Sequence, residues 1–186
     1  MSNVNSFFNQ YQDLLTAQAK AFKTAIDEHG IESLSNPDSF FKISATNPGM
    51  VKVNQEAASQ GFSTNAFGWM TSASFIVGAQ TLTPLILEKE GKETRGSWTS
   101  TTLGLSAGAA TGPMWGFFNH DPKWLIIDDG GTHVNTYGDG FALVAGIEQL
   151  FFTRSADDSF LGWMIGPVAG LNSNIFKAGI SGKISS

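Results

Sequence analysis

The sequence lacks cysteine altogether and has few charged residues for its 186 positions. Without cysteine, a disulfide framework, a Cys-based zinc site and a thiol nucleophile are all excluded. Charged residues make up 15 %, and the net charge is −5 at pH 7, which argues against nucleic-acid binding because that function needs a basic surface. Since 41 % of the residues are hydrophobic, disorder is not expected either.

Long apolar runs are also missing. No window reaches 18 apolar residues, so we expect no transmembrane segment. The first residues, Met1–Asn5, have neither a basic nor an apolar region of the kind that a secretory signal carries. The sequence therefore predicts a protein that is cytoplasmic or exported by a non-classical route, and it does not choose between them.

Glycine and tryptophan are distributed unevenly along the chain. Residues 1–61 contain three of the 21 glycines and no tryptophan, whereas residues 62–186 contain the other 18 glycines and all five tryptophans. This change of composition predicts a domain boundary near Gly61, with an N-terminal segment over 1–61 and a second domain over 62–186.

The N-terminal segment has the periodicity of amphipathic helices. Its apolar residues recur at intervals of three and four from Val4 to Ile26, and Gly30 is a suitable end for this helix. Asn36-Pro37-Asp38 predicts the start of a second helix, since Asn caps helices and Pro favours their first turn. A short third helix is expected over 53–58.

The second part has the alternation of β-strands. Phe67, Trp69, Thr71, Ala73, Phe75 and Val77 follow period two, and glycine-rich or acidic turns such as Glu90-Gly91-Lys92 separate the later segments. Seven or eight short strands at this spacing predict an antiparallel barrel or sandwich. They are expected at 67–77, 81–89, 94–105, 114–118, 132–137, 141–154, 159–165 and 175–184. Residues 121–129 suit either a short helix or a strand.

From Phe67 onward the chain resembles the virulence-associated (Vap) proteins of Rhodococcus. The segment Gly96–Gly104 (GSWTSTTLG) is similar to that family's glycine–aromatic–serine strand, and Trp115-Gly116 follows a glycine- and alanine-rich run as it does in the family. Phe151-Phe152, an acidic turn and Leu161-Gly162 resemble the family's later hairpin. The resemblance covers about two-thirds of the chain.

The resemblance implies a compact eight-stranded antiparallel β-barrel with one short helix and a filled interior. It also implies a non-enzymatic, exported protein that acts in host–bacterium interaction. Two features differ from the family's pattern, because no signal peptide is visible and the N-terminal region is helical rather than of low complexity. The fold class expected is therefore mainly β, with an N-terminal helical segment packed on the barrel.

One motif suggests catalysis. Residues Gly104–Gly108 satisfy G-x-S-x-G with Ser106 as nucleophile, and Asp128 or Asp129 and His133 follow in the order of α/β-hydrolases. That elbow requires a sharp turn between a strand and a helix, and no helix of useful length is expected after Ser106. A serine esterase is therefore the weakest of the functions considered, and we nominate no catalytic residue.

Other candidate groups have ordinary structural explanations. His120-Asp121, Asp128-Asp129, His133 and Asp139 lack the spacing of zinc or calcium ligands, so no metal is expected. No G-x-G-x-x-G or P-loop occurs, so no cofactor is expected. Glu148 is an acid within the expected strand 141–154, and its direction depends on whether Gly146 forms a bulge; it can simply face solvent.

The aromatic residues form either an exposed platform for sugars or lipids or, as we favour, the filling of the barrel and its ends. Phe151-Phe152 must place one ring on each side of its strand, so one ring lies outside the barrel. We expect the N-terminal helix to cover it. The rival use of that helix is membrane contact, which the net charge of −1 over 1–28 opposes except in acid.

These observations predict a non-enzymatic interaction or effector protein that acts through its surface on a protein or membrane-surface partner. The alternative is a small β-barrel that binds a lipid or another apolar ligand in its interior. The sequence leaves open whether the interior is filled or hollow, and it does not indicate the oligomeric state.

Overall fold

The computed structural model describes the backbone of residues 2–126, 132–139, 147–167, 169–170 and 176–186. Side chains in 2–5, 8, 74–76, 102–110, 132, 135–139, 169–170 and 176–181 are not described. The helices are α1 (Ser2–His29), α2 (Ile31–Ser35), α3 (Pro37–Thr46), α4 (Pro48–Ser59) and α5 (Pro122–Leu125). The strands are β1 (Thr64–Lys89), β2 (Lys92–Phe118), β3 (Thr132–Asp139), β4 (Ile147–Arg154), β5 (Phe160–Pro167), β6 (Ala169–Gly170) and β7 (Phe176–Ser185).

Short-range signals define the ends of the helices. Gly30, with φ of 79°, separates α1 from α2, as expected for a residue without a side chain. The side chain of Asn36 accepts a hydrogen bond from the amide of Ser39, and Asn47 caps α4 in the same way through the amides of Gly49 and Met50. The helix expected over 4–26 and the start at 36–38 are therefore confirmed. In contrast, α4 begins five residues before the predicted 53, and α2 was not predicted.

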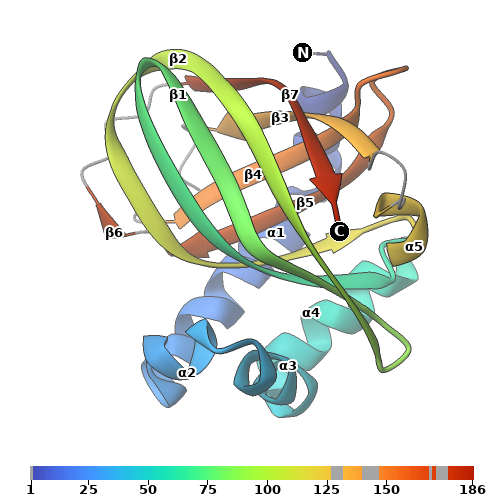
Figure 1. The fold of residues 1–186 in the computed structure, drawn as a ribbon. Helices are drawn as coiled ribbons and strands as arrows, with labels where there is room; N and C mark the ends of the chain where they lie inside the picture. The colour runs from blue at the N-terminus through green and yellow to red at the C-terminus, as the bar shows by residue number, and fades with distance from the viewer. Residues whose placement is uncertain (1, 127–131, 140–146, 168, 171–175) are drawn as a thin grey trace.

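The strands form a closed antiparallel barrel around two long, bent strands (Figure 1). The first half of β1 pairs with the second half of β2 up to Phe118, and its second half pairs with the first half of β2. Next, β2 contacts β5 through its C-terminal half and β7 through its N-terminal half. Strands β5, β4, β3 and β7 complete the ring. Because each long strand supplies two arms, the predicted eight-stranded antiparallel barrel is confirmed.

Two details of the strand prediction are wrong. The breaks expected between 77 and 81 and between 105 and 114 do not exist, because β1 and β2 bend while they stay paired. Register shifts between Phe75 and Ile76 and between Leu82 and Leu85 accompany the bending, as bulges do in barrels. Within the ambiguous segment 121–129, Pro122–Leu125 form the short helix α5. Residues 127–131 and 140 lie outside the described residues.

Glycine allows the strands of the barrel wall to approach closely. A Cβ atom on Gly116 would lie 2.0 Å from the carbonyl oxygen of Trp163 on the neighbouring strand, and one on Gly162 would lie 2.2 Å from that of Phe117. No side chain fits at such distances. The close approach of neighbouring strands therefore explains why glycine occurs inside them, although glycine weakens an isolated strand.

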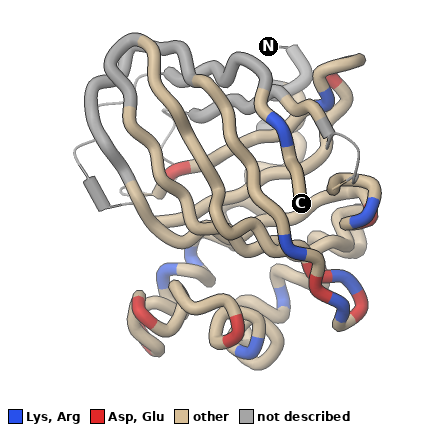
Figure 2. Tube along the Cα trace, in the orientation of Figure 1, with Lys and Arg blue, Asp and Glu red and all other residues tan. Residues whose placement is uncertain are grey.

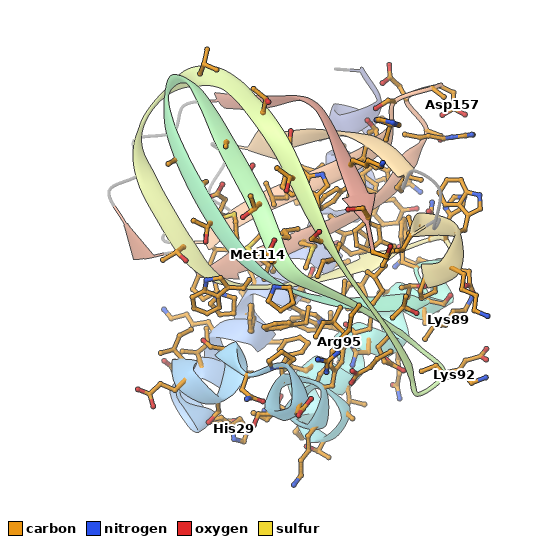
Figure 3. The ribbon with its side chains drawn as sticks, viewed as in Figure 1. His29, Lys89, Lys92, Arg95, Met114 and Asp157 are labelled. Carbon is orange, nitrogen blue, oxygen red and sulfur yellow. The ribbon has the colours of Figure 1, made fainter. Side chains whose placement is uncertain are left out.

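Two hydrophobic clusters lie on opposite sides of the barrel wall. The inner cluster fills the described part of the barrel with large side chains that include Trp98, Phe118 and Phe152, and Met114 also lies in it (Figure 3). The outer cluster joins the helices to the wall, and Phe151 belongs to it. Phe151 and Phe152 are both fully buried, one on each side of β4. The predicted division of this pair, with the helices as cover for the outer ring, is confirmed.

Helix α1 lies against the barrel wall in the way that the sequence predicted. Its apolar stripe is buried in the outer cluster, including Phe7, Leu15 and Phe22. The ring of Phe7 stacks on that of Phe160 with 3.7 Å between centroids, and the ring of Phe22 meets Trp115 edge-on at 5.7 Å. The apolar face of α1 is therefore occupied by the barrel and is not presented to a membrane in this structure.

Candidate functional site

A concave surface lies on the helical layer, between α1 and α4. The two helices run antiparallel, as three contacts along them show. At one end the carboxylate of Glu28 accepts a hydrogen bond of 2.8 Å from the side-chain amide of Asn47. Further along, Ala21 lies beside Gly49, and Tyr11 meets the ring of Phe62 beyond the end of α4 at 5.6 Å. We call the depression between them the α1–α4 groove.

Small and apolar residues form the floor of the α1–α4 groove. Leu14, Ala21 and Val53 are buried at its base, and Ala17 and Gly49 line it while exposed. Its volume is about 690 Å³, which is within the range of about 300–1,000 Å³ that is typical of ligand pockets. The concavity exists because Ala17, Ala21 and Gly49 have almost no side chain to fill it.

Charged residues line the α1–α4 groove in an ordered sequence. Along α1 they are Asp13, Lys20 and Glu28, and along α4 they are Lys52 and Glu56. Because the helices are antiparallel, the two lysines fall in the middle part of the groove and the acids toward its ends. Figure 2 shows that charges gather on the helices and on the β1–β2 hairpin, whereas the barrel wall is mainly uncharged. The groove thus combines an apolar floor with a cationic centre.

The described part of the barrel interior is filled rather than hollow. Its core consists of fully buried side chains, among them Trp98, Phe118, Leu150 and Phe152. The rings of Trp98 and Phe118 both contact Phe152, at 5.5 and 5.2 Å between centroids. Eight strands leave just enough room for side chains or for one small ligand, and in this part of the barrel the side chains occupy that room.

A polar group is nevertheless buried inside the barrel. Glu148 is only 8 % exposed, on the same side of β4 as Leu150 and Phe152. The side-chain amide of Gln80 donates to its carboxylate at 3.3 Å and lies 3.0 Å from the sulfur of Met70. Since β1 and β4 are not adjacent in the sheet, this hydrogen bond spans the interior. The alternative that Glu148 faces solvent is wrong.

A second polar cluster lies at the end of the barrel beside α5. The ring of Trp124 stacks on His120 at 4.0 Å, and the guanidinium of Arg154 lies 5.6 Å from the same ring. Partial burial, and secondarily the positive charge of Arg154, lower the pKa of His120 below its ordinary value. Hydrogen bonds from Ser159 lower the pKa of Asp157, which also pairs with Arg154 at 3.5 Å. These contacts tie α5 to the β4–β5 turn.

The structure removes the setting that the Ser106 motif needs. Ser106 lies within the continuous strand β2, at the register shift opposite Phe75 and Ile76, and no helix follows it. His133 is exposed on β3, while Asp128 and Asp129 lie outside the described residues. Gly104–Gly108 therefore lacks the strand–turn–helix setting of a nucleophile elbow.

No group of three or more potential ligands that could hold a metal ion occurs among the residues that the structure describes. His120 and Asp121 are adjacent in the chain, but the ring nitrogen of His120 contacts Asn119 at 2.5 Å and Asp121 caps α5. Asp157 and Asp158 form the turn between β4 and β5. Within the described helices, none is both long and apolar enough to cross a bilayer.

The aromatic residues do not form an exposed platform in the part of the chain with described side chains. Trp98, Trp115 and Trp163 are fully buried, and Trp69 and Trp124 are partly buried. Only Ile31 and Val77 are exposed among the large hydrophobic side chains described. The preferred prediction, that aromatic residues fill the barrel and the space beneath the helices, is confirmed for the three buried tryptophans.

Sequence reasoning missed the α1–α4 groove. The available signal was the pair Ala17 and Ala21, which are one helical turn apart and leave a gap in the side chains along α1. A second signal was Gly49, directly after Pro48 at the start of α4. Neither signal identifies its partner, because only the packing of α1 against α4 brings the small residues together.

Comparison with protein-family models and with curated proteins finds no match. The solved structures that match include two proteins of the intracellular pathogen Rhodococcus equi. The first, the virulence-associated protein VapD, has a TM-score of 0.47 and 13 % identity, over 66 % of this chain and 98 % of VapD. The second, the virulence-associated protein VapB, has a TM-score of 0.39 and 19 % identity, over 64 % of this chain and 94 % of VapB. Both carry the designation of the family that the motifs resemble.

Proposed function

We propose that this protein is a non-enzymatic interaction protein that acts through the surface of its helical layer, as an effector in host–bacterium interaction. The observation that carries the proposal is the α1–α4 groove, whose volume of about 690 Å³ lies outside a barrel with a filled core. The groove has an apolar floor and charged edges, which is the composition expected of a recognition site. The host-facing part of the proposal rests on the motifs that resemble the Vap family.

The alternative functions have less support. Ligand binding inside the barrel requires space, and the inner cluster around Trp98 and Phe152 occupies the described part of it. An esterase at Ser106 requires a turn that β2 does not form. A serine-reactive fluorophosphonate provides the test: no labelling, or labelling that survives Ser106→Ala, is expected. Labelling that Ser106→Ala abolishes would restore the enzyme hypothesis.

Site-specific crosslinking tests the surface proposal. A photoreactive benzoylphenylalanine replaces Ala17 in the groove, and in a matched variant it replaces Thr71, which is exposed on the outer wall of the barrel. Each protein is irradiated with an extract of host cells and the adducts are measured by intact mass. A defined adduct is expected at position 17, and it should decrease in excess unlabelled wild-type protein but not in excess Ala17→Trp, whose indole fills the groove.

Two outcomes would contradict the proposal. One is an equal adduct at position 71, because this would show unspecific contact. The other is equal competition by wild-type protein and Ala17→Trp, because the groove would then play no part in binding. Circular dichroism of each variant serves as the control for folding.

A further inference from the structure

Another depression lies where the β1–β2 hairpin meets helices α3 and α4. We call it the hairpin pocket and define it by five of its lining residues, which are Phe41, Ser44, Asn54, Glu88 and Glu93. It shares no lining residue with the α1–α4 groove. Its lining contains two acids and no lysine, arginine or histidine. The hairpin pocket is therefore a separate and acidic site.

The register of the hairpin brings the two acids together. Glu88 and Glu93 are direct partners across β1 and β2, so their side chains lie on the same face of the hairpin. Like charges directly opposite one another destabilise a sheet. Lys89 and Lys92 form the next pair, and the alternation of a strand places them on the other face, where Lys89 lies 3.7 Å from Asp121. The hairpin thus turns an acidic pair toward the helices and keeps its lysines on the opposite side.

Cations of the chain compensate this acidic pair only in part. The guanidinium of Arg95 lies 3.5 Å from the carboxylate of Glu93, but it is shared with Asp38 at 3.8 Å. Within the described residues, no ion pair within 4.0 Å involves Glu88. One oxygen of Glu88 accepts a hydrogen bond of 2.6 Å from the amide of Gly91, which carries no charge. At least one carboxylate of the pocket is therefore without a counter-ion from the chain.

The other polar groups of the hairpin pocket also favour a ligand that donates hydrogen bonds. The side-chain amide of Asn54 donates to the backbone oxygen and the hydroxyl of Ser44, at 3.0 and 3.1 Å. The amide of Asn65 donates to the same hydroxyl at 3.3 Å. These bonds use the amide nitrogens, whereas the buried side-chain oxygen of Asn54 has no hydrogen-bond partner. The polar groups that remain are therefore acceptors.

We propose that the hairpin pocket binds a guanidinium group, as carried by an arginine side chain of a partner protein. A guanidinium has a permanent positive charge and only hydrogen-bond donors, so it matches carboxylates and unused acceptors. Its planar face can also lie against the ring of Phe41, which lines the pocket and is partly exposed. An ammonium group supplies the charge without this planar contact. The inference goes beyond the proposed function, because the site lies outside the α1–α4 groove.

Calorimetric titration of the full chain with Nα-acetyl-arginine methylamide, at low ionic strength, tests the inference. Saturable 1:1 binding is expected. The citrulline analogue, which has nearly the same shape but no charge, should bind at least tenfold more weakly. The same loss is expected when the lysine analogue replaces arginine at the Phe41 ring. Absence of arginine binding, or equal binding of the citrulline analogue, would overturn the inference.

Variants of the two acids assign the binding to the hairpin pocket. Glu88→Gln/Glu93→Gln keeps an acceptor for the amide of Gly91 but removes both charges, and it should lower the affinity about tenfold. Asp27→Asn/Glu32→Gln is the matched control, because it removes two negative charges at exposed positions outside the pocket and should leave the affinity unchanged. Equal affinities of the first variant and wild-type protein would overturn the assignment.

Stability separates a binding role of the acids from a structural one. Since the two carboxylates repel each other in the free protein, Glu88→Gln/Glu93→Gln should unfold at the same or a slightly higher denaturant concentration than wild type. A clearly lower midpoint would show that these carboxylates serve the fold, and it would overturn the inference.

Other ligands give different results. Binding of Ca²⁺ in place of the arginine compound would identify a metal site and overturn the inference. An acetylated and amidated Gly-Gly-Arg-Gly-Gly peptide should bind as tightly as the single residue. If agmatine binds and this peptide does not, the ligand is a free guanidinium compound and the partner protein is refuted. None of these measurements involves position 17, so this inference and the proposed function of the α1–α4 groove can fail separately.

Discussion

Gln18 provides the sharpest test of how α1 is attached to the barrel. Its side chain is fully buried beneath the helix. The amide nitrogen donates to the backbone carbonyl of Trp115 at 2.9 Å, and the amide oxygen accepts from the indole nitrogen of Trp163 at 2.6 Å. One residue of α1 therefore satisfies two polar groups of the wall that no water can reach. Gln18→Leu removes both hydrogen bonds and keeps a side chain of similar size.

The expected loss follows from the two groups left behind. An unpaired buried donor or acceptor costs about 1–3 kcal/mol, so the carbonyl of Trp115 and the indole of Trp163 together cost about 2–6 kcal/mol. The apolar surface of leucine offsets part of this loss. We expect Gln18→Leu to lower the free energy of unfolding by about 3 kcal/mol. For a chain of this size, each kcal/mol corresponds to about 2–4 °C, which gives a decrease of about 6–12 °C in Tm.

Denaturant unfolding followed by circular dichroism measures this loss. Gln12→Leu, at an exposed position of the same helix, is the control and should stay within about 0.5 kcal/mol of wild type. Trp163→Phe removes the indole donor, so its cost should be smaller in the Gln18→Leu background than in wild type. If Gln18→Leu unfolds within about 1 kcal/mol of wild type, the two hydrogen bonds do not hold α1 in place and the reasoning is refuted.

Three further perturbations follow from the geometry. Gly116→Ala places a methyl group 2.0 Å from the carbonyl oxygen of Trp163 and should destabilise the barrel by about 1–3 kcal/mol, measured by denaturant unfolding; an unchanged midpoint would contradict the close packing. Deletion of residues 1–30 exposes the outer cluster and should lower solubility or Tm. An unchanged melting curve would contradict the role of α1 in covering the barrel wall. Burial and Arg154 lower the pKa of His120, so the unfolded chain takes up a proton first as the pH falls below about 6.5. Stability should therefore decrease from pH 7 toward pH 5, and His120→Asn should make this decrease shallower; equal pH profiles would refute the link.

Local patterns predicted most of the secondary structure. The apolar stripe of α1 and the cap at Asn36 depend on residues within a few positions of one another, so they can be identified without the fold. The opposite directions of Phe151 and Phe152 follow in the same way from the alternation of a strand. Bending was not predictable to the same degree, because glycine and alanine indicate where a strand can curve but not whether its pairing continues.

The contacts that attach α1 to the barrel and that cross the barrel interior join residues distant in sequence. Gln18 meets Trp115 and Trp163 across about 97 and 145 positions, and Gln80 reaches Glu148 across 68. The direction of Glu148 follows from its place on β4. Residues 141–146 of the predicted strand 141–154 lie outside the described residues. The hydrophobic periodicity of a single segment does not show which distant residues its side chains will contact.

By itself, the sequence determined that helices precede a cysteine-free set of antiparallel strands, and that aromatic residues must be buried on both sides of these strands. It did so because these properties depend on composition and on periods of two and 3.6 residues. Only the tertiary structure decided that the described interior is filled, that Ser106 lies within a strand, and that α1 and α4 leave a groove between Ala17 and Val53. The physical reason is that a concave surface arises from how two elements pack, so the sequence of one element alone does not determine the shape of the groove.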